Sequence, residues 1–194
     1  MTDFKEFIQL AYEDSLDLKS TKMAFMQIMN GEISEIQISS FISLLQKSGV
    51  KSHHVIAALE VMRKKMLSIN APLNTMDTCG TGGDGKNSLN ISTATAFVLA
   101  ASGIPIAKHG NRALTSKCGS ADVLKALKIN VDMETSKLED CLRNIGICFM
   151  FAPNHHPAMK HVAQVRQLLG FRTIFNMLGP VSYTHLTLPT TPYV

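Results

Sequence analysis

Apolar residues in the first seventy positions recur at the spacing of amphipathic helices. Four helical runs are expected, with apolar positions at Phe4, Phe7, Ile8 and Ala11; at Phe25, Ile28 and Met29; at Phe41, Leu44 and Leu45; and at Val55, Ile56, Leu59 and Met62. Gly31 ends the second run and Gly49 the third, Ser34 and Gln37 form a capping box, and Ser52 is placed to cap the fourth run. The pattern predicts a small helical domain over residues 1–71.

Beyond residue 71 the pattern changes to short apolar segments that alternate with helices and glycine-bearing loops. Buried strands are expected at residues 104–107 and 147–151, and helices at residues 93–102, 120–127, 137–145 and 157–169. This alternation is typical of an α/β layer with a largely parallel sheet. We therefore expect an α/β fold in which the helical domain is followed, from about Ala71 and Pro72, by a truncated α/β domain over residues 72–181.

The end of the sequence has a different character. Between Thr173 and Val194 there is no Lys, Arg, Asp or Glu, and the stretch from Val181 onward contains four threonines and two prolines. Such a stretch forms no amphipathic helix pattern. We expect residues 182–194 to be a non-native tail.

Composition narrows the class of protein. The 194 residues are 45% hydrophobic and 18% charged, which is typical of a chain that buries a core, and the mild net charge of +4 does not indicate nucleic acid binding. The uncharged stretch at residues 87–107 is too polar and too interrupted by Gly103 and Pro105 to cross a bilayer as one helix. The four cysteines form no CxxC pair and no secretory segment opens the chain. We expect reduced thiols, no membrane association and a cytoplasmic protein.

Four of the twelve glycines lie in the segment Cys79-Gly-Thr-Gly-Gly-Asp-Gly-Lys86. Such a loop lets backbone N–H groups approach an anion closely. Gly80, Gly82 and Gly85 satisfy a GxGxxG pattern, but a dinucleotide site needs a helix directly after the third glycine. A P-loop needs Ser or Thr where Asn87 stands. The loop indicates an anion site of another kind, and a glycine-rich turn without a ligand is the alternative.

A second anion-binding feature follows at Asn90-Ile-Ser-Thr-Ala94, which precedes an uninterrupted helical run. Ser92 and Thr93 then stand at a helix N-terminus, where free N–H groups and the helix dipole favour a phosphate. The alternative is that Ser92 only caps the helix.

A third feature is the segment Lys108-His-Gly-Asn-Arg112, which continues through several hydroxyl residues to Ser120. Fixed cations, an imidazole and hydroxyls after a strand suit a phosphorylated and hydroxylated ligand. A solvated basic turn is the alternative, which explains the cations but not Gly110, Asn111 and the hydroxyls.

A fourth feature is Phe151-Ala-Pro-Asn-His155-His156-Pro157, followed by Met159 and Arg166. The two histidines are adjacent, so their side chains diverge, and the segment lacks further ligands at zinc spacing. An apolar wall with imidazoles and one arginine suits a flat aromatic carboxylate, because guanidinium pairs with carboxylate in a fork. The alternative is an Arg166 that only faces solvent.

Several motifs in this order resemble one enzyme family. They are Gly80-Thr-Gly-Gly-Asp84, Asn90-Ile-Ser-Thr93, Lys108-His-Gly-Asn-Arg112, Gly119-Ser-Ala-Asp122, Phe151-Ala-Pro153, Gly170-Phe-Arg-Thr173 and Leu178-Gly-Pro180. Up to about residue 181 the chain resembles the anthranilate phosphoribosyltransferases. The resemblance implies a fold of the nucleoside phosphorylase/phosphoribosyltransferase type, a homodimer formed by the helical domain, and transfer of a phosphoribosyl group from phosphoribosyl pyrophosphate (PRPP) to anthranilate in tryptophan biosynthesis.

The resemblance also implies roles for individual residues. PRPP would be bound by Gly80, Gly83, Asp84, Ser88, Asn90, Ile91, Ser92, Thr93, Lys108, His109, Gly110, Asn111, Arg112, Ala113, Leu114, Thr115, Ser116 and Ser120. Anthranilate would be contacted by Gly80, Asn111 and Arg166, and its approach lined by His109, Pro153, His156 and Met159. Ser92 would touch the Mg²⁺ cofactor, and no residue is expected to act as a covalent nucleophile.

The sequence also departs from the family. Family chains continue beyond the Leu178-Gly-Pro180 motif and later carry an adjacent Asp-Glu pair that binds magnesium, and neither feature is present in this sequence. We therefore expect the chain as given to be an inactive fragment. Two alternatives stay open: an enzyme like the pyrimidine nucleoside phosphorylases, and a non-catalytic helical dimerisation module with a phosphate-binding remnant.

Overall fold

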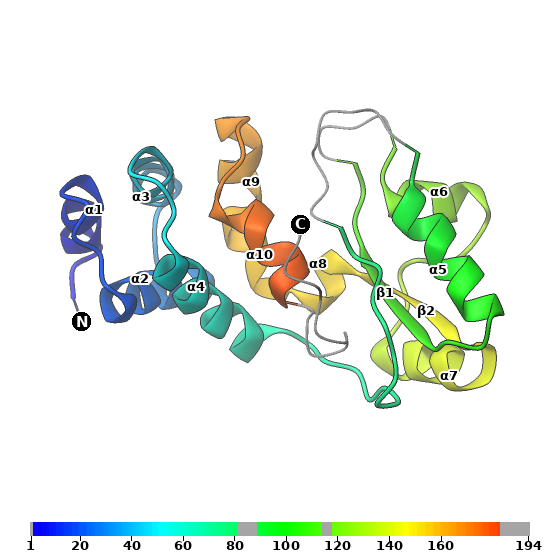
Figure 1. The fold of residues 1–194 in the computed structure, drawn as a ribbon. Helices are drawn as coiled ribbons and strands as arrows, with labels where there is room; N and C mark the ends of the chain where they lie inside the picture. Colours follow the sequence, from blue (N-terminus) through cyan, green and yellow to red (C-terminus); the bar gives the residue numbers. More distant parts are fainter. Residues whose placement is uncertain (1, 81–88, 114–117, 183–194) are drawn as a thin grey trace. The chain divides into compact units, whose positions relative to one another are not determined.

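The structure is a computed structural model that describes residues 2–80, 89–113 and 118–182. The described chain forms two compact units, which are treated separately: Met1–Met66 joined by His156–Ser182, and Leu67–His155. Figure 1 shows the order of the elements along the chain. No helix in the described ranges is long and apolar enough to cross a membrane.

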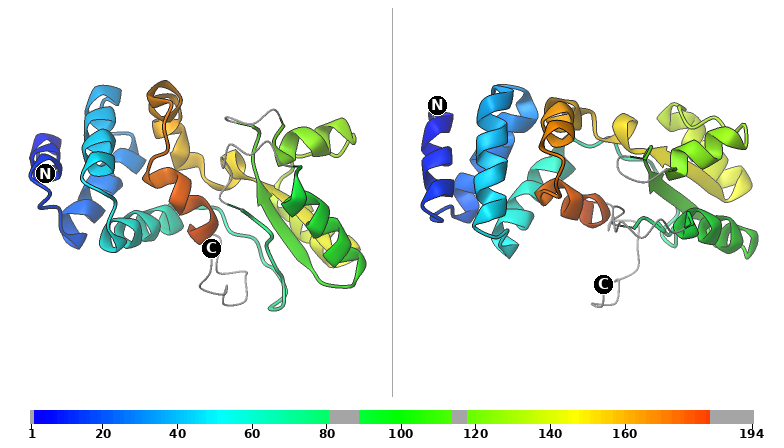
Figure 2. Two further views of the ribbon diagram at one scale, coloured as in Figure 1. Left: turned by 45° about the horizontal axis from the view of Figure 1, so that its top comes forward. Right: turned by 90° about the horizontal axis from the view of Figure 1, so that it is seen from above.

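The first unit is a bundle of helices. Its N-terminal part contains α1 (Phe4–Tyr12), α2 (Leu18–Asn30), α3 (Glu35–Lys47) and α4 (Ser52–Lys65), so the four expected helices are confirmed. The 3₁₀ helix η1 (Pro157–Met159), α9 (Lys160–Leu169) and α10 (Ile174–Ser182) complete the unit. Within it α1 packs beside α3 and α2 beside α4, as both views of Figure 2 show.

The ends of these helices follow the sequence signals with one exception. The Ser34 hydroxyl accepts a hydrogen bond from the Gln37 N–H, and Gly31 and Gly49 adopt φ values of +75° and +87°. The expectation that Ser52 caps α4 is wrong, because Ser52 is the first helical residue and Lys51 is the cap. The Lys51 N–H donates to His54 Nδ1 at 3.1 Å, so an imidazole in the first turn accepts from the N–H of the cap residue.

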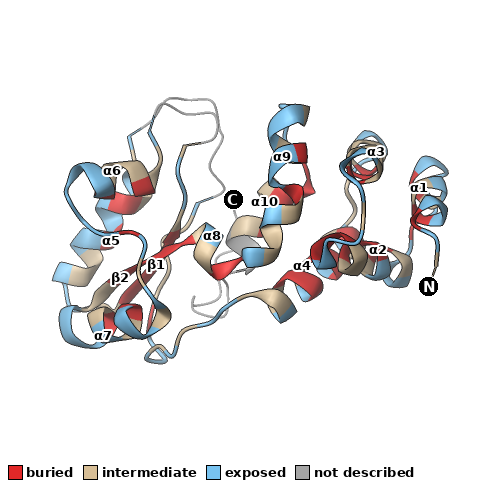
Figure 3. Ribbon diagram, turned by 180° about the vertical axis from the view of Figure 1, so that it is seen from behind, coloured by how far each residue is buried: buried red, intermediate tan, exposed pale blue. Residues whose placement is uncertain are grey.

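A cluster of aromatic rings forms the centre of the helical unit. Phe41 contacts Phe4 and Phe25 edge to face, with ring centroids 5.6 and 5.9 Å apart, and Phe25 contacts Phe175 at 5.8 Å. Figure 3 shows the buried residues on the inward faces of these helices. Residues 156–182 belong to this core because α9 and α10 bury apolar side chains such as Val162 in it. This differs from the expected domain limits, which gave residues 72–181 to the α/β domain.

The second unit is a small α/β layer. It contains α5 (Ile91–Ala101), β1 (Ile106–Gly110), α6 (Ser120–Ala126), α7 (Thr135–Ile145), β2 (Ile147–Phe151) and the short helix α8 (Ala152–His155). The expected parallel pairing is confirmed: β1 and β2 run parallel in a register from Ile106↔Ile147 to Gly110↔Phe151. Met76 adds a parallel bridge to Ile106 on the other side of β1.

Two boundaries and one additional helix differ from the expectation at prolines. The first strand begins at Ile106 and not at Ile104, because Pro105 has no N–H to donate to the ladder. The expected helix over residues 157–169 begins instead as a 3₁₀ turn at Pro157. Helix α8 was not expected, because its four residues include Pro153 and proline usually argues against a helix. Proline is nevertheless tolerated in the first turn of a helix.

The two faces of β2 are covered by different helices. Cys148 and Met150 pack with Leu138 and Leu142 of α7, while Phe149 and Phe151 pack with α6. This alternation follows from the two-residue period of a strand. The unit is therefore a layered α/β structure, and its strands end at an edge where polar segments gather.

Candidate functional site

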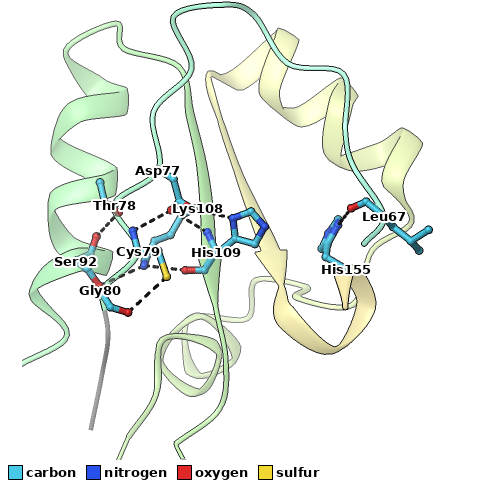
Figure 4. Close-up of polar contacts among 9 residues, drawn as sticks. All are labelled: Leu67, Asp77, Thr78, Cys79, Gly80, Ser92, Lys108, His109 and His155. Atoms are coloured by element: carbon cyan, nitrogen blue, oxygen red, sulfur yellow. Dashed lines mark hydrogen bonds and ion pairs between the residues drawn. The ribbon is translucent and has the colours of Figure 1, made fainter. Parts of the chain in front are cut away.

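Three segments of the α/β unit meet where the parallel strands end. The Met76 N–H donates to the Pro105 carbonyl, and the Ala107 N–H donates to the Met76 carbonyl, both at 2.9 Å. Residues 76–79 therefore run alongside β1, and the Thr78 hydroxyl reaches the Ser92 carbonyl at 2.9 Å in the first turn of α5 (Figure 4). In open α/β sheets, ligands bind in this position, outside the carboxyl ends of the strands.

A buried lysine lies at this meeting point. Lys108 on β1 is only 3% exposed, and its ammonium donates to Ser92 Oγ and to the His109 carbonyl, each at 3.2 Å. Burial lowers the pKa of Lys108, and the nearby Asp77 carboxylate opposes this shift. Both the cation and the N-terminus of α5 carry positive charge, so an anion bound here would be favoured by both.

Asp77 and His109 form a buried pair beside this lysine. Their side chains are 1% and 5% exposed, and His109 Nδ1 lies 2.7 Å from Asp77 Oδ2. Asp77 Oδ1 accepts from the N–H groups of His109 at 3.1 Å and of Cys79 at 2.9 Å. Sequence reasoning did not identify Asp77, although a carboxylate directly before a glycine loop is a signal that could have been used.

The Cys79 thiol next to this pair is not activated as a nucleophile. Burial is the main cause that raises the pKa of Cys79 to about 12, and the Asp77 carboxylate adds to the shift. Its Sγ lies 3.6 Å from the Gly80 carbonyl oxygen. The thiol therefore stays protonated at neutral pH.

The loop after β1 is held at its ends by Asp122. One carboxylate oxygen accepts from the Ala113 N–H at 3.0 Å and from the Gly119 N–H at 2.8 Å, and these bonds lower the pKa of Asp122. A Cβ on Gly119 would lie 2.4 Å from the Ala113 nitrogen. The close approach of the two ends therefore requires glycine. Asp122 is a second residue whose role the sequence did not indicate.

The same close packing applies where β1 ends. A Cβ on Gly110 would lie 2.5 Å from Ser120 Oγ and 2.6 Å from the Phe149 ring. The adjoining Asn111 and Arg112 are exposed, and the Arg112 guanidinium lies over the Phe151 ring at 5.7 Å. The interpretation of residues 108–112 as only a solvated basic turn is wrong, because Lys108 and His109 are buried.

The start of α5 corrects one interpretation of Ser92. The helix begins at Ile91 with Asn90 as its cap, so Ser92 is not the capping residue. Its hydroxyl faces the Lys108 ammonium instead. Thr93 is buried, and its hydroxyl has no hydrogen-bond partner among the residues that the structure describes.

The residues expected near an aromatic carboxylate lie on several elements. Arg166, His156 and Met159 belong to the helical unit, where Arg166 is half-buried and its guanidinium lies 5.6 Å from the Phe175 ring centroid. The alternative interpretation, in which Arg166 only faces solvent, is therefore wrong. Pro153 is exposed on α8 of the α/β unit, where His155 Nδ1 bonds the Leu67 carbonyl at 2.9 Å.

Six of the expected site residues lie outside the described residues: Gly83, Asp84, Ser88, Leu114, Thr115 and Ser116. Within the described ranges, no group of three or more His, Cys, Asp or Glu side chains is arranged to hold a metal ion. The structure brings together Ser92, Lys108 and His109, with Asp77 as an added member. This arrangement can bind an anionic group at the start of α5.

Known proteins have sequences similar to that of this chain. A protein named anthranilate phosphoribosyltransferase from Parvibaculum lavamentivorans is 49% identical over 183 residues, which is 94% of this chain and 54% of the relative. One of the same name from Xanthobacter autotrophicus is 45% identical over 183 residues and is covered to 53%. The chain thus spans about half the length of these curated relatives.

Solved structures give the same result. The anthranilate phosphoribosyltransferase of Thermus thermophilus superposes with a TM-score of 0.84 and 36% identity, over 91% of this chain and 54% of that one. The Saccharomyces cerevisiae enzyme in complex with PRPP and Mg has a TM-score of 0.84 and 26% identity, over 93% and 55% of the two chains. The resemblance in the sequence motifs is confirmed by these likenesses.

Two family descriptions match successive parts of the chain. Residues 7–66 match the helical bundle domain of a glycosyl transferase family, and residues 73–188 match its a/b domain. The two matches follow the order of a helical domain and an α/β domain that the sequence pattern predicts. The chain therefore belongs to this glycosyl transferase family.

Proposed function

We propose that the chain supplies the PRPP-binding part of an enzyme that transfers the phosphoribosyl group to anthranilate, a step of tryptophan biosynthesis, and that the chain alone does not carry out the transfer. The observation that carries the proposal is the buried Lys108 ammonium, 3.2 Å from Ser92 Oγ at the first turn of α5. The names of the relatives support anthranilate as the acceptor, and the yeast neighbour in complex with PRPP and Mg supports the donor.

The pyrophosphate of PRPP suits the start of α5. Its negative charge would be met by the Lys108 ammonium and the helix dipole, with the Ser92 hydroxyl and backbone N–H groups as donors. We assign the described part of the donor site to Gly80, Asn90, Ile91, Ser92, Thr93, Lys108, His109, Gly110, Asn111, Arg112, Ala113 and Ser120. Gly83, Asp84, Ser88, Leu114, Thr115 and Ser116 complete the proposed set.

The acceptor would be held by a second group of residues. Arg166 is assigned to the anthranilate carboxylate because a guanidinium and a carboxylate share two parallel hydrogen bonds. Gly80 and Asn111 contact the acceptor, and His109, Pro153, His156 and Met159 line its approach. These assignments follow the family motifs.

The proposed reaction does not require a strong side-chain base. The amine nitrogen of anthranilate attacks C1 of the ribose, the bond from C1 to the pyrophosphate oxygen breaks, and the nitrogen releases one proton to water. An aromatic amine supplies its own lone pair, so holding the two reactants in line and stabilising the departing pyrophosphate account for much of the rate. Lys108 is placed to stabilise that leaving group.

Mg²⁺ fits this site when it binds together with the phosphate oxygens of the substrate. Mg²⁺ prefers oxygen ligands and usually keeps several waters and phosphate oxygens. The Ser92 hydroxyl offers one oxygen, whereas the Asp77 carboxylate is occupied by three hydrogen bonds. The resemblance assigns the ion to Ser92, and the ion would neutralise developing negative charge on the pyrophosphate.

Further properties belong to the same proposal. By their order in the sequence, we assign residues 1–71 to a dimerisation domain, residues 72–181 to the donor-binding domain and residues 182–194 to a tail, although residues 156–182 pack in the helical unit. Exposed apolar side chains on the first helices, such as Tyr12 and Ile36, support a homodimer. All four cysteines are free, which supports a reducing, cytoplasmic location.

Isothermal titration calorimetry of the chain with PRPP and MgCl₂ tests the proposal. We expect binding by the wild type and a loss of roughly tenfold or more in affinity for Ser92→Ala, because the variant loses a hydrogen bond to a charged group. Ser102→Ala is the matched control, since this hydroxyl lies at the other end of α5 and donates to the Val98 carbonyl at 2.9 Å. Absence of binding by the wild type, or equal losses in both variants, would contradict the proposal.

A further inference from the structure

We propose that Asp77 is a positioning residue that fixes which ring nitrogen of His109 carries the proton and ties this imidazole to the start of the glycine loop. Asp77 lies outside the motifs on which the resemblance rests. The effect of Asp77 on anthranilate binding rests on the proposed function. The position of the hydrogen on the His109 ring can be measured independently of that function.

The pattern of donors around Asp77 establishes that its carboxyl group is an acceptor. Oδ1 receives two backbone N–H groups, from Cys79 at 2.9 Å and from His109 at 3.1 Å. Oδ2 lies 2.7 Å from His109 Nδ1. A carboxylate accepts on both oxygens and donates on neither, so Nδ1 must be the nitrogen that carries hydrogen.

This assignment determines the other side of the ring. A neutral imidazole with hydrogen on Nδ1 has an acceptor lone pair on Nε2. The pair is enclosed, with side chains 1% and 5% exposed, so water competes little with the bond. The His155 ring meets the His109 ring edge to face at 5.9 Å, which limits rotation of the imidazole.

One carboxylate thereby connects two parts of the proposed site (Figure 4). Through the Cys79 N–H it holds the residue directly before Gly80, and through His109 it holds the end of β1. Gly80 and His109 are each assigned both to the donor site and to the acceptor side. Asp77 therefore sets the orientation of an acceptor-side imidazole against the beginning of the donor loop.

The Asp77→Asn variant separates the backbone contacts from the imidazole contact. Asparagine keeps one oxygen that can receive the two backbone N–H groups, and its NH₂ group then faces His109 Nδ1. Because that group donates, Nδ1 must become the acceptor and the hydrogen moves to Nε2. Asp132→Asn is the matched control in the same unit, since Asp132 is exposed and accepts from Asn154 at 2.7 Å.

Long-range ¹H–¹⁵N NMR of the histidine rings in the full chain reads this state directly. The His109 signals are assigned by their disappearance in His109→Gln. We expect the Nδ1–H form in the wild type and in Asp132→Asn, and the Nε2–H form in Asp77→Asn. An Nε2–H form in the wild type overturns the proposal even if Asp77→Asn does not fold, and so does an unchanged ring in a folded Asp77→Asn.

Ligand titrations examine the consequence for the site. The affinity for anthranilate, followed by its fluorescence in the presence of PRPP and MgCl₂, is expected to fall about tenfold in Asp77→Asn, since a charge-assisted contact is replaced. The affinity for PRPP alone should fall less than the affinity for anthranilate, because asparagine keeps the two backbone contacts that hold the residue before Gly80. Equal losses for both ligands would overturn the positioning role. A wild type that binds neither ligand would overturn the proposed function, and the ring measurement would then decide on Asp77 alone.

Discussion

The Lys108 ammonium lies 3.2 Å from the Ser92 hydroxyl, so β1 delivers a buried positive charge to the first turn of α5. The two residues are sixteen positions apart, and the parallel strand and the helix after the glycine loop bring them together. A cation at a helix N-terminus is unfavourable until an anion joins it. This relationship is the basis of the proposed PRPP site.

Lys108→Met should separate binding from stability. We expect the affinity for PRPP to fall at least about tenfold, because a charged contact to the pyrophosphate is lost. The free energy of unfolding should stay within about 1 kcal/mol of the wild type, since removal of a buried charge offsets the loss of two hydrogen bonds. Calorimetry and chemical denaturation measure the two quantities. Lys137→Met, at an exposed position on α7, is the control and should change neither.

Two glycines near the site should respond differently to alanine. In Gly119→Ala the new Cβ would meet backbone atoms at 2.4 to 2.6 Å, so we expect a loss of about 2 to 4 kcal/mol in the free energy of unfolding. A Cβ on Gly80 meets no atom within 4 Å. Gly80→Ala should therefore keep the stability but weaken PRPP binding. A stable Gly119→Ala in denaturation experiments would refute the role given to this close contact.

His54 should make the helical unit sensitive to acid. Burial is the main cause that lowers the pKa of His54, and neighbouring His53 and Lys51 add to the shift while Asp14 opposes it. The unfolded chain then binds the proton more readily near the ordinary pKa of about 6.5. The contribution of His54 to the free energy of unfolding is therefore fully present above a pH of about 6.5 and is lost as the pH decreases below this value.

The His54→Asn variant tests this pH dependence. Asparagine can still accept the Lys51 N–H, which His54 Nδ1 accepts at 3.1 Å. Denaturation at pH 7.5 and pH 5.5 should show a smaller decrease for the variant than for the wild type. Some decrease should remain, because burial also lowers the pKa of His155. An identical decrease in both proteins would rule out His54 as a source.

Arg166→Ala should affect one substrate more than the other. We expect anthranilate affinity to fall roughly tenfold or more while the affinity for PRPP is spared, as loss of a charge-assisted pair costs about 1.5 to 3 kcal/mol. Gln167→Ala, exposed on the same helix, is the control. If both ligands bind equally weakly to Arg166→Ala, the contact of Arg166 with Phe175 supports the fold and not the acceptor.

Sequence patterns predicted the helices and strands better than they predicted which of these elements pack together. The helical and strand periodicities placed the four first helices and the parallel strands, because burial of one face leaves a period in the sequence. They did not show that α9 and α10 complete the helical core, since an apolar stripe does not specify which surface covers it. The anion site was predicted from glycines, hydroxyls and cations.

The supporting residues of the site could not be predicted in the same way. Asp77 lies 32 positions from His109 and Asp122 nine positions from Ala113, so the carboxylates can be noted in the sequence but the groups that they contact cannot. The burial of Lys108 was equally hidden, because a lysine in a short polar motif gives no sign of its exposure. Such contacts depend on the pairing of segments that are distant in the chain.

Backbone amide NMR during titration with PRPP and MgCl₂ tests the central claim most directly, because it locates the ligand without any substitution. We expect the largest chemical-shift changes at residues 78–80, 91–93 and 108–112, and small changes at the C-terminal end of α5 near Ala101. Absence of shift changes, or changes gathered instead around Asp132 and Asn154, would contradict a donor site built on Lys108 and Ser92.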